Sequence, residues 1–338
     1  MSNQVSLLTN GGEVASVQNM GSEDRARYTR NLIDTMAGET FRAYRSRLSK
    51  FAAWCAEAGR SSMPAEPATV AAYLEELERQ GKRPATICQV VAAIAKAHKA
   101  EGLASPCSSD MVKAARKAAI RRAADRGEGA PHQKDAATLG VLRTIISGID
   151  GTALKDKRDK ALLLMGFFGA FRRSELSALR CSDLREDRAA DGRPVLVVTI
   201  RKSKTDQAGH GMEKAIFAAA GRSKAACPVR AVREWIAAAG LAGDDALFPS
   251  IRKGGHVAGQ PLSGHAVARI VQERAAAAGV EMDLAGHSLR RGFVTEAVKA
   301  GATERAIMHQ TGHKSPMMVR RYIERHDAIS DNAASMIA

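Results

Sequence analysis

Eleven residues near the middle of the chain separate two regions with different sequence patterns. Residues 125–135 read DRGEGAPHQKD, a stretch that combines glycine, proline and charged residues and holds no apolar side chain larger than alanine. This composition is typical of an interdomain linker. The chain has 338 residues, which leaves enough length on each side of the linker for a separate hydrophobic core.

The region before the linker predicts a small helical domain. Residues 1–21 are rich in glycine, serine and asparagine, and we expect a mobile tail there. Between residues 22 and 124 the apolar side chains recur with the period of amphipathic helices. Thr40 and Thr86 are expected to cap two of these helices, Pro64 and Pro67 to open another, and Asp110 to Ala124 to form the last.

The region after the linker, residues 136–338, mixes both kinds of element. Helical spacing covers residues 139–149, 157–168 and 173–178. Val195 to Ile200 predicts a strand, and Lys214 to Phe217 is a candidate partner strand. Helices are expected from Pro228 to the end of the chain. The predicted fold class is therefore mainly α, with a small β-sheet in the second domain.

The net charge of +15 indicates an anionic partner, either nucleic acid or a membrane surface. Residues 1–130 hold 19 basic against 14 acidic residues, and residues 131–338 hold 32 against 22. The longest apolar run, Ala161 to Phe171, has eleven residues, whereas a membrane-spanning helix needs about 20. The N-terminus lacks a secretory signal pattern, and the five scattered cysteines suggest a reducing compartment. We therefore expect a cytoplasmic protein that binds nucleic acid.

Several catalytic motifs are missing from the sequence. It has neither a GxxxxGK[ST] phosphate-binding loop nor a GxGxxG after a strand. His309 and His313 are spaced like zinc ligands on a helix, but the QTG between them lacks the glutamate of a metalloprotease. There is no GxSxG elbow and no cluster of carboxylates. The sequence therefore predicts neither a nucleotide cofactor nor a catalytic metal.

Three basic segments of the second region occur in a demanding order. FFGAFRRSEL covers residues 167–176, HSLRR covers 287–291, and QTGHKSPMMVRRYI covers 310–323. Taken singly, each has an ordinary explanation, such as exposed arginines on a helix or a packed tyrosine. Together they form an HxxR box, then 22 residues, then a histidine preceded by glycine, then eight residues, then Tyr322.

This combination resembles the tyrosine recombinase (phage integrase) family over residues 139–323. In the first region, FAAWCAEAG followed by PAEPATVAAYL is similar to the Cre-like branch of that family. The resemblance implies a helical core-binding domain and a catalytic domain that form a clamp around duplex DNA.

The resemblance assigns the phosphate-binding arginines. Arg172 matches the first arginine of the family and Arg290 the second, with Glu175 orienting the basic cluster. Where the family has glycine before Phe171, this chain has Ala170, which puts the local turn in doubt. Two guanidinium groups can grip phosphate oxygens in a forked geometry and stabilise a five-coordinate phosphorus without a metal ion.

The remaining catalytic roles also follow from the resemblance. Tyr322 is the nucleophile; because a phenol has a pKa near 10, it needs a base or a strongly positive site, which His287 and the arginines can supply. His313 would hydrogen-bond the scissile phosphate. Lys204 would protonate the leaving 5′ oxygen, with Lys202 as the competing candidate.

The reaction that the resemblance implies is site-specific strand exchange. Tyr322 attacks a phosphodiester and forms a 3′-phosphotyrosine, and a 5′ hydroxyl of another duplex then attacks that ester. Bond energy is conserved, so neither ATP nor metal is needed. Four protomers would act on two sites with inverted repeats, through a Holliday junction, in DNA integration or resolution. The tail at residues 327–338 is expected to dock on a neighbouring protomer.

DNA contacts outside the reaction centre are expected from two helices of the first domain and from neighbours of the catalytic residues. In the first domain they are Arg42, Arg45, Arg47 and Gln89, which either read base edges or touch only phosphates. In the second domain they are Arg173, Lys202, His265 and Arg291, of which Arg173 and Arg291 are expected to face DNA backbone or solvent. His265 is either a base-reading residue or an ordinary surface histidine.

Two other functions remain open for this sequence. One keeps the chemistry, as a type IB topoisomerase-like relaxing enzyme or an integrase that needs accessory proteins. The other is a DNA-binding regulator without catalysis, built on an inactivated integrase. The presence of all six catalytic positions argues against the second.

Overall fold

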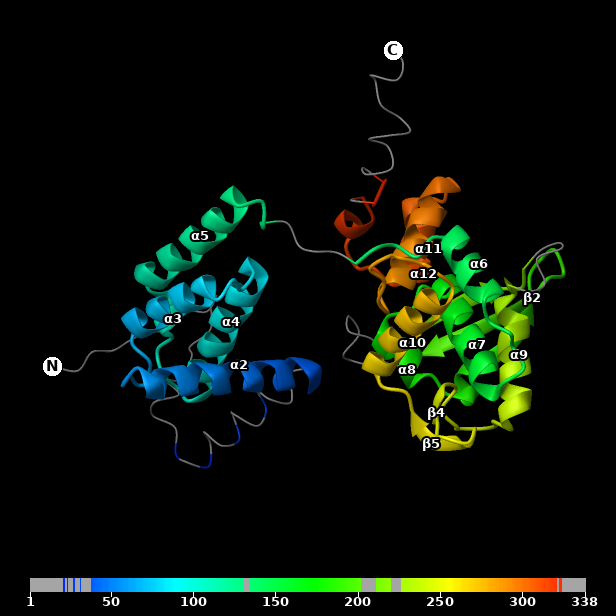
Figure 1. Cartoon of the computed structure of the whole chain (residues 1–338), viewed down its shortest axis with the longest axis horizontal. Coiled ribbons are helices and arrows are strands. Elements are labelled where there is room, and N and C mark those ends of the chain that lie inside the picture. Colours follow the sequence, from blue (N-terminus) through cyan, green and yellow to red (C-terminus); the bar gives the residue numbers. More distant parts are fainter. Residues whose placement is uncertain are drawn as a thin grey trace, which may run out of the picture. The chain divides into compact units, whose positions relative to one another are not determined.

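The computed structural model describes residues 21, 23, 27, 31, 38–129, 134–201, 211–219, 226–320 and 322–323. The contacts between residues divide the chain into two compact units, residues 1–132 and 133–338. The division falls inside the segment that we expect to be the linker. Figure 1 shows helices in both units and strands in the second. No helix of the described ranges is both long and apolar enough to cross a bilayer.

Four helices and a short 3₁₀ turn make up most of the described part of the first unit. They are α2 (Gly38–Glu57), α3 (Pro67–Arg79), α4 (Pro84–Ala100), the turn Pro106–Ser108 and α5 (Asp110–Asp125). The apolar stripe of each helix faces a shared core whose largest buried members include Phe51, Tyr73 and Leu74. The predicted all-helical character of this region is confirmed.

Two of the predicted helix caps are wrong. Thr40 lies inside α2, which begins at Gly38, and Thr86 lies inside α4, which begins at Pro84. A proline fits the first helical position because its fixed φ suits a helix and its missing N–H would have no partner there. Pro67 opens α3 for the same reason, whereas Pro64 precedes that helix.

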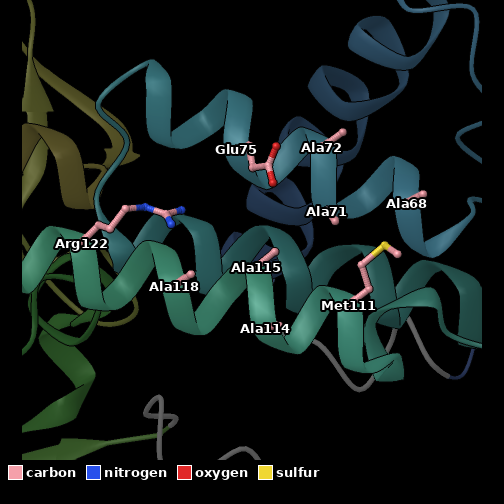
Figure 2. Close-up of a pocket in the computed structure, with 9 residues that line it drawn as sticks. All are labelled: Ala68, Ala71, Ala72, Glu75, Met111, Ala114, Ala115, Ala118 and Arg122. Atoms are coloured by element: carbon pink, nitrogen blue, oxygen red, sulfur yellow. The ribbon is translucent and has the colours of Figure 1, made fainter.

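A hollow of about 470 Å³ lies between α3 and α5. Figure 2 shows alanines of both helices along it, with Met111 and Arg122 farther apart on α5. Arg122 donates two hydrogen bonds to the carboxylate of Glu78, at 2.8 and 2.6 Å. None of the catalytic or DNA-binding residues predicted from the sequence lines this hollow.

The second unit places its helices around a central one. Its helices are α6 (Leu139–Ser147), α7 (Leu154–Phe168), α8 (Arg173–Ala178), α9 (Pro228–Ala239), α10 (Gly264–Ala277), α11 (Ser288–Lys299) and α12 (Glu304–Thr311). Residues 316–320 and 322–323 are also helical. α7 packs against α6, α9 and α11, and its side chains from Leu162 to Met165 are fully buried. The C-terminal half of α7 is thus apolar all round and forms the middle of the core.

Two small antiparallel sheets complete this unit. β1 (Leu184–Arg188), β2 (Pro194–Ile200) and β3 (Met212–Phe217) pair in the order β1-β2-β3, and β4 (Pro249–Ile251) pairs with β5 (Val257–Pro261). The predicted pairing of the segments 195–200 and 214–217 is confirmed. The prediction of uninterrupted helices after Pro228 is wrong, because β4 and β5 interrupt them. β1, LREDR, was missed because four of its five residues are charged and exposed.

Candidate active site

The turn that follows α7 carries the first arginine. Ala170 has φ of 45°, in the left-handed region where glycine is favoured, and this is the position at which the family has glycine. Alanine therefore adopts here a backbone conformation that glycine adopts more easily. Arg172 directly precedes α8, and its backbone N–H donates to Glu175 Oε2 at 2.9 Å. The Arg172 guanidinium donates to the other oxygen of Glu175, so one carboxylate orients both groups.

Arg290 reaches the same turn from α11. Its side chain is 2% exposed, and Nη1 donates to the carbonyl of Ala170 at 2.7 Å. Nη2 is buried and has no hydrogen-bond partner among the described residues. Burial and the nearby Arg172 lower the pKa of Arg290 to about 10. A buried N–H group left unpaired costs free energy, and an anion at this place would satisfy it.

Two histidines flank these arginines. His287 directly precedes α11, and His313 follows the end of α12, with Nδ1 at 2.9 Å from the hydroxyl of Thr311. Although part of His287 is exposed, desolvation of its ring and the arginines around it lower its pKa to about 4. Burial, Arg290 and Arg172 lower the pKa of His313 to about 4 as well. Both rings are therefore neutral at pH 7.

Tyr322 lies on the last helical segment of the described chain. It is half-buried and packs on a small apolar cluster of Val294, Ile307 and Val319. The Arg291 guanidinium lies 6.0 Å from the centre of the Tyr322 ring.

The expectation that Arg291 faces DNA backbone or solvent is wrong. Arg291 is 9% exposed, and Nη1 donates to the carbonyl of Lys134. It follows Arg290 on α11, where successive side chains point in directions about 100° apart, and this turns it toward the segment before α6 and toward Tyr322.

The other predicted site residues of this unit have different positions. Arg173 is half-buried, with its side chain against Gly286, and His265 is exposed in the first turn of α10. Lys202, Lys204 and the tail at 327–338 lie outside the described residues. No group of three or more His, Cys, Asp or Glu in the described ranges could hold a metal ion.

In the first unit, two of the predicted DNA-binding residues are in contact. Arg47 of α2 donates to the side-chain oxygen of Gln89 on α4, and also to the carbonyl of Ala43 at 2.9 Å. Arg42 and Arg45 are exposed on α2. The structure thus joins the two helices that we expect to bind DNA, and base reading by these residues remains a prediction.

Sequence reasoning missed Lys214. This lysine of β3 is 0% exposed, and its ammonium donates to the carbonyls of Gly169 and Ala170. It also lies 3.7 Å from Glu175 Oε2. Alternation along a strand gave the signal, because Lys214 falls on the same face of β3 as the buried Ile216.

Two family models match the chain. The model of the phage integrase family covers residues 141–328, and the model of the phage integrase N-terminal SAM-like domain covers residues 26–100. Among curated proteins, the integrase/recombinase XerD homolog of Selenomonas ruminantium is 35% identical over 308 residues, which are 90% of this chain and 86% of that protein. The Cre recombinase of Escherichia phage P1 is 26% identical over 293 residues, 82% of this chain and 81% of that protein.

Solved structures share the fold at low sequence identity. XerH recombinase bound to palindromic difH, in a post-cleavage complex, has a TM-score of 0.59 at 17% identity and covers 87% of this chain and 79% of that one. A λ integrase dimer bound to a COC′ core site has a TM-score of 0.57 at 18% identity, with coverage of 90% and 95%. A λ integrase tetramer on a Holliday junction has a TM-score of 0.52 at 17% identity, with coverage of 88% and 75%.

Proposed function

Because this chain belongs to the phage integrase family and is thus a site-specific DNA recombinase of the tyrosine type, we propose that it cuts and rejoins DNA through a covalent bond to Tyr322. The reaction would need neither ATP nor a metal ion, because the arginines supply the positive charge and the covalent bond conserves the energy of the phosphodiester. The observation that carries this proposal is the buried, unpaired Nη2 of Arg290 beside Arg172, with the Tyr322 ring 6.0 Å from the guanidinium of the next residue, Arg291.

Arg172 and Arg290 bind the scissile phosphate in this proposal. Both guanidinium groups are anchored at one side, Arg172 on Glu175 and Arg290 on the carbonyl of Ala170. Their remaining N–H groups are left to donate to non-bridging phosphate oxygens. Since donors fixed in advance stabilise a charge that grows in the transition state, these two residues would supply most of the rate acceleration.

The cleavage step includes two proton transfers, one from the phenol of Tyr322 and one to the departing 5′ oxygen. The Tyr322 oxygen attacks phosphorus while the bond from phosphorus to the 5′ oxygen breaks. His287, neutral at pH 7, accepts the phenolic proton, and Lys204 gives a proton to the departing 5′ oxygen. The products are a 3′-phosphotyrosine and a free 5′ hydroxyl. The same steps in reverse, with a 5′ hydroxyl from a second duplex, rejoin the strand.

His313 binds the phosphate after taking up a proton. The hydroxyl of Thr311 donates to the carbonyl of Ile307 at 2.7 Å, so it accepts the hydrogen of His313 Nδ1. This assigns the proton of the neutral ring to Nδ1 and leaves Nε2 without one. Nε2 can donate to a phosphate oxygen only when the ring is protonated, and a bound anion favours that form.

We further propose that four protomers act on two duplexes that carry inverted repeats, with a Holliday junction between the two strand exchanges. The fold shared with a recombinase tetramer on such a junction supports this assembly. The first unit would grip the duplex through Arg42, Arg45, Arg47 and Gln89, and the second through Arg173, Lys202 and His265. A cytoplasmic location follows from action on DNA in this way.

The test is a trap for the covalent intermediate. Duplex DNA that binds the protein is first selected from a random-sequence pool, and the protein is then incubated with it in EDTA without ATP and denatured in detergent. We expect a protein–DNA adduct from the wild type and none from Tyr322→Phe at equal DNA binding. Tyr44→Phe, which removes the same hydroxyl from α2 in the first unit, is the matched control and keeps the adduct.

Two results would overturn this proposal. An undiminished adduct in Tyr322→Phe would show that another residue is the nucleophile. A wild-type protein that binds the selected duplex tightly but forms no adduct would place the chain among DNA-binding regulators without catalysis.

A further inference from the structure

The C-terminal end of α7 receives hydrogen bonds from three other elements. Gln310 of α12 donates to the carbonyl of Phe168 at 2.8 Å. Lys214 of β3 donates to the next two carbonyls, of Gly169 at 2.8 Å and of Ala170 at 3.3 Å. Arg290 of α11 donates to the Ala170 carbonyl as well. Three elements distant in sequence are thus fixed at the turn that leads into Arg172.

Lys214 is the most deeply buried cation of the described structure. Its ammonium lies 4.6 Å from the centre of the Phe171 ring and 3.7 Å from Glu175 Oε2. The carbonyls at the end of a helix carry a partial negative charge that attracts a cation. The face of an aromatic ring attracts one too, so the carbonyls, the Phe171 ring and Glu175 favour the charge of the Lys214 ammonium, whereas Arg290 and Arg172 oppose it.

Because Lys214 is buried, it cannot take part directly in the reaction on DNA. With 0% of the residue exposed, its ammonium cannot reach a phosphate, and its protons are directed at two carbonyls and a carboxylate. The loss of water lowers the pKa of Lys214 to about 7, against the opposing effect of Glu175. A charge kept inside the protein at such a cost needs a reason beyond packing.

The contacts of Lys214 give that reason. Glu175 binds the guanidinium of Arg172, and the Ala170 carbonyl binds the guanidinium of Arg290. Lys214 is bonded to both of these anchors. One buried cation therefore fixes the acceptors that set the place of each phosphate-binding arginine.

We propose that Lys214 is a positioning residue for DNA cleavage, which holds Arg172 and Arg290 at the separation that one phosphate requires. This inference rests on the proposed function, because it presumes that the two arginines share a phosphate. Without the ammonium, the Ala170 carbonyl keeps only one donor and Glu175 keeps only Arg172. The left-handed turn at Ala170 then loses a restraint, and the arginines lose their fixed separation.

The experiment compares Lys214→Met with Ile216→Val. Methionine has a similar length but neither charge nor donor, and Ile216 is a buried apolar residue on the same face of β3, without a hydrogen-bonding side chain. For each variant we measure the melting temperature, the Kd for the selected duplex, and the first-order rate of adduct formation at saturating protein. Lys214→Gln, which keeps an N–H for the Gly169 carbonyl, is measured in the same way in case Lys214→Met does not fold.

The expected result is a split between binding and rate. Lys214→Met or Lys214→Gln lowers the adduct rate by about 30-fold or more, as a loss of preorganised donors would, with the Kd within about threefold of wild type. Ile216→Val lowers the melting temperature and leaves the rate unchanged. In a cycle with Glu175→Gln, the double variant is slower than wild type by less than the product of the two single effects, because both substitutions act through one cluster.

An adduct rate within threefold of wild type in a folded, charge-free Lys214 variant would overturn the inference while the proposed function stands. Strictly multiplicative effects in the cycle with Glu175→Gln would overturn it as well. Failure of the proposed function gives a different result, since the wild type itself then forms no adduct.

Discussion

Replacement of Arg290 by lysine separates the geometry of the site from its charge. The wild-type side chain uses Nη1 for the Ala170 carbonyl and keeps the buried Nη2 for an incoming anion. Lysine has one nitrogen, which can serve either acceptor but not both in a planar fork. The positive charge remains, so a loss of activity measures the loss of the second donor.

The magnitude follows from two parts of the structure. The fall of the Arg290 pKa to about 10 corresponds to about 3 kcal/mol against the charged form in the DNA-free protein. A bound phosphate removes that cost, most fully in the transition state where its charge is greatest. The loss of one preorganised donor costs about 3 to 4 kcal/mol of transition-state stabilisation, a factor of roughly 10² to 10³ in rate.

The assay is single-turnover adduct formation at saturating protein, with the Kd measured separately by fluorescence anisotropy. We expect Arg290→Lys to slow the adduct by roughly 10²-fold or more with a Kd close to that of the wild type. The defect should grow as pH rises, because the same burial lowers the pKa of a lysine from a lower starting value. Arg143→Lys, at an exposed position of α6, is the control. A rate within tenfold of wild type, or a loss confined to Kd, would refute the reasoning.

Two more predictions concern the fold and the charge of the site. In Gly292→Ala the new Cβ would lie 1.7 Å from the carbonyl oxygen of Ala137, so we expect urea unfolding to show a destabilisation of about 1 to 3 kcal/mol. The control is Gly140→Ala, in the open on α6, where a new Cβ should not destabilise the protein. Equal stability of the two variants would contradict the packing. Because the pKa of His313 is about 4 in the free protein and a phosphate raises it, DNA binding at pH 6 should take up protons. Calorimetry in two buffers of different ionisation enthalpy measures this proton uptake, and His313→Gln should reduce it. A binding enthalpy that is the same in both buffers would contradict the predicted uptake.

The sequence patterns determined much of the architecture before any coordinates. Periodic apolar residues located the helices of both units, since a helix buries one stripe whatever its partner. The β2–β3 pair was predictable because β2 is an almost continuous apolar run and buried and exposed side chains alternate along β3. β1 was not, because its charged residues join the sheet through backbone pairing with β2. The start of α2 at Gly38 was misplaced as well, because Thr40 is a typical N-cap residue that a helix also tolerates within its first turn.

The reaction centre divides in the same way. The resemblance to the tyrosine recombinase family, which rests on the order and spacing of three boxes, singled out Arg172, Arg290 and Tyr322. The same spacing gave no hint that Arg291 is buried against Lys134 and Tyr322. Sequence reasoning also ranked Lys204 against Lys202 and passed over Lys214, because a lysine on a predicted strand is ordinarily solvated.

The sequence by itself determined which chemical groups the proposed site offers to a phosphate. The tertiary structure decided how those groups are held: Arg290 on the carbonyl of a left-handed alanine, Arg172 on a buried carboxylate, and both acceptors on Lys214. The physical reason is that a residue's type is local, whereas its anchoring depends on carbonyls and carboxylates that α7, β3 and α11 bring together from distant parts of the chain. Burial then lowers the pKa of Arg290 and of Lys214, and this burial depends on the packing of these distant elements.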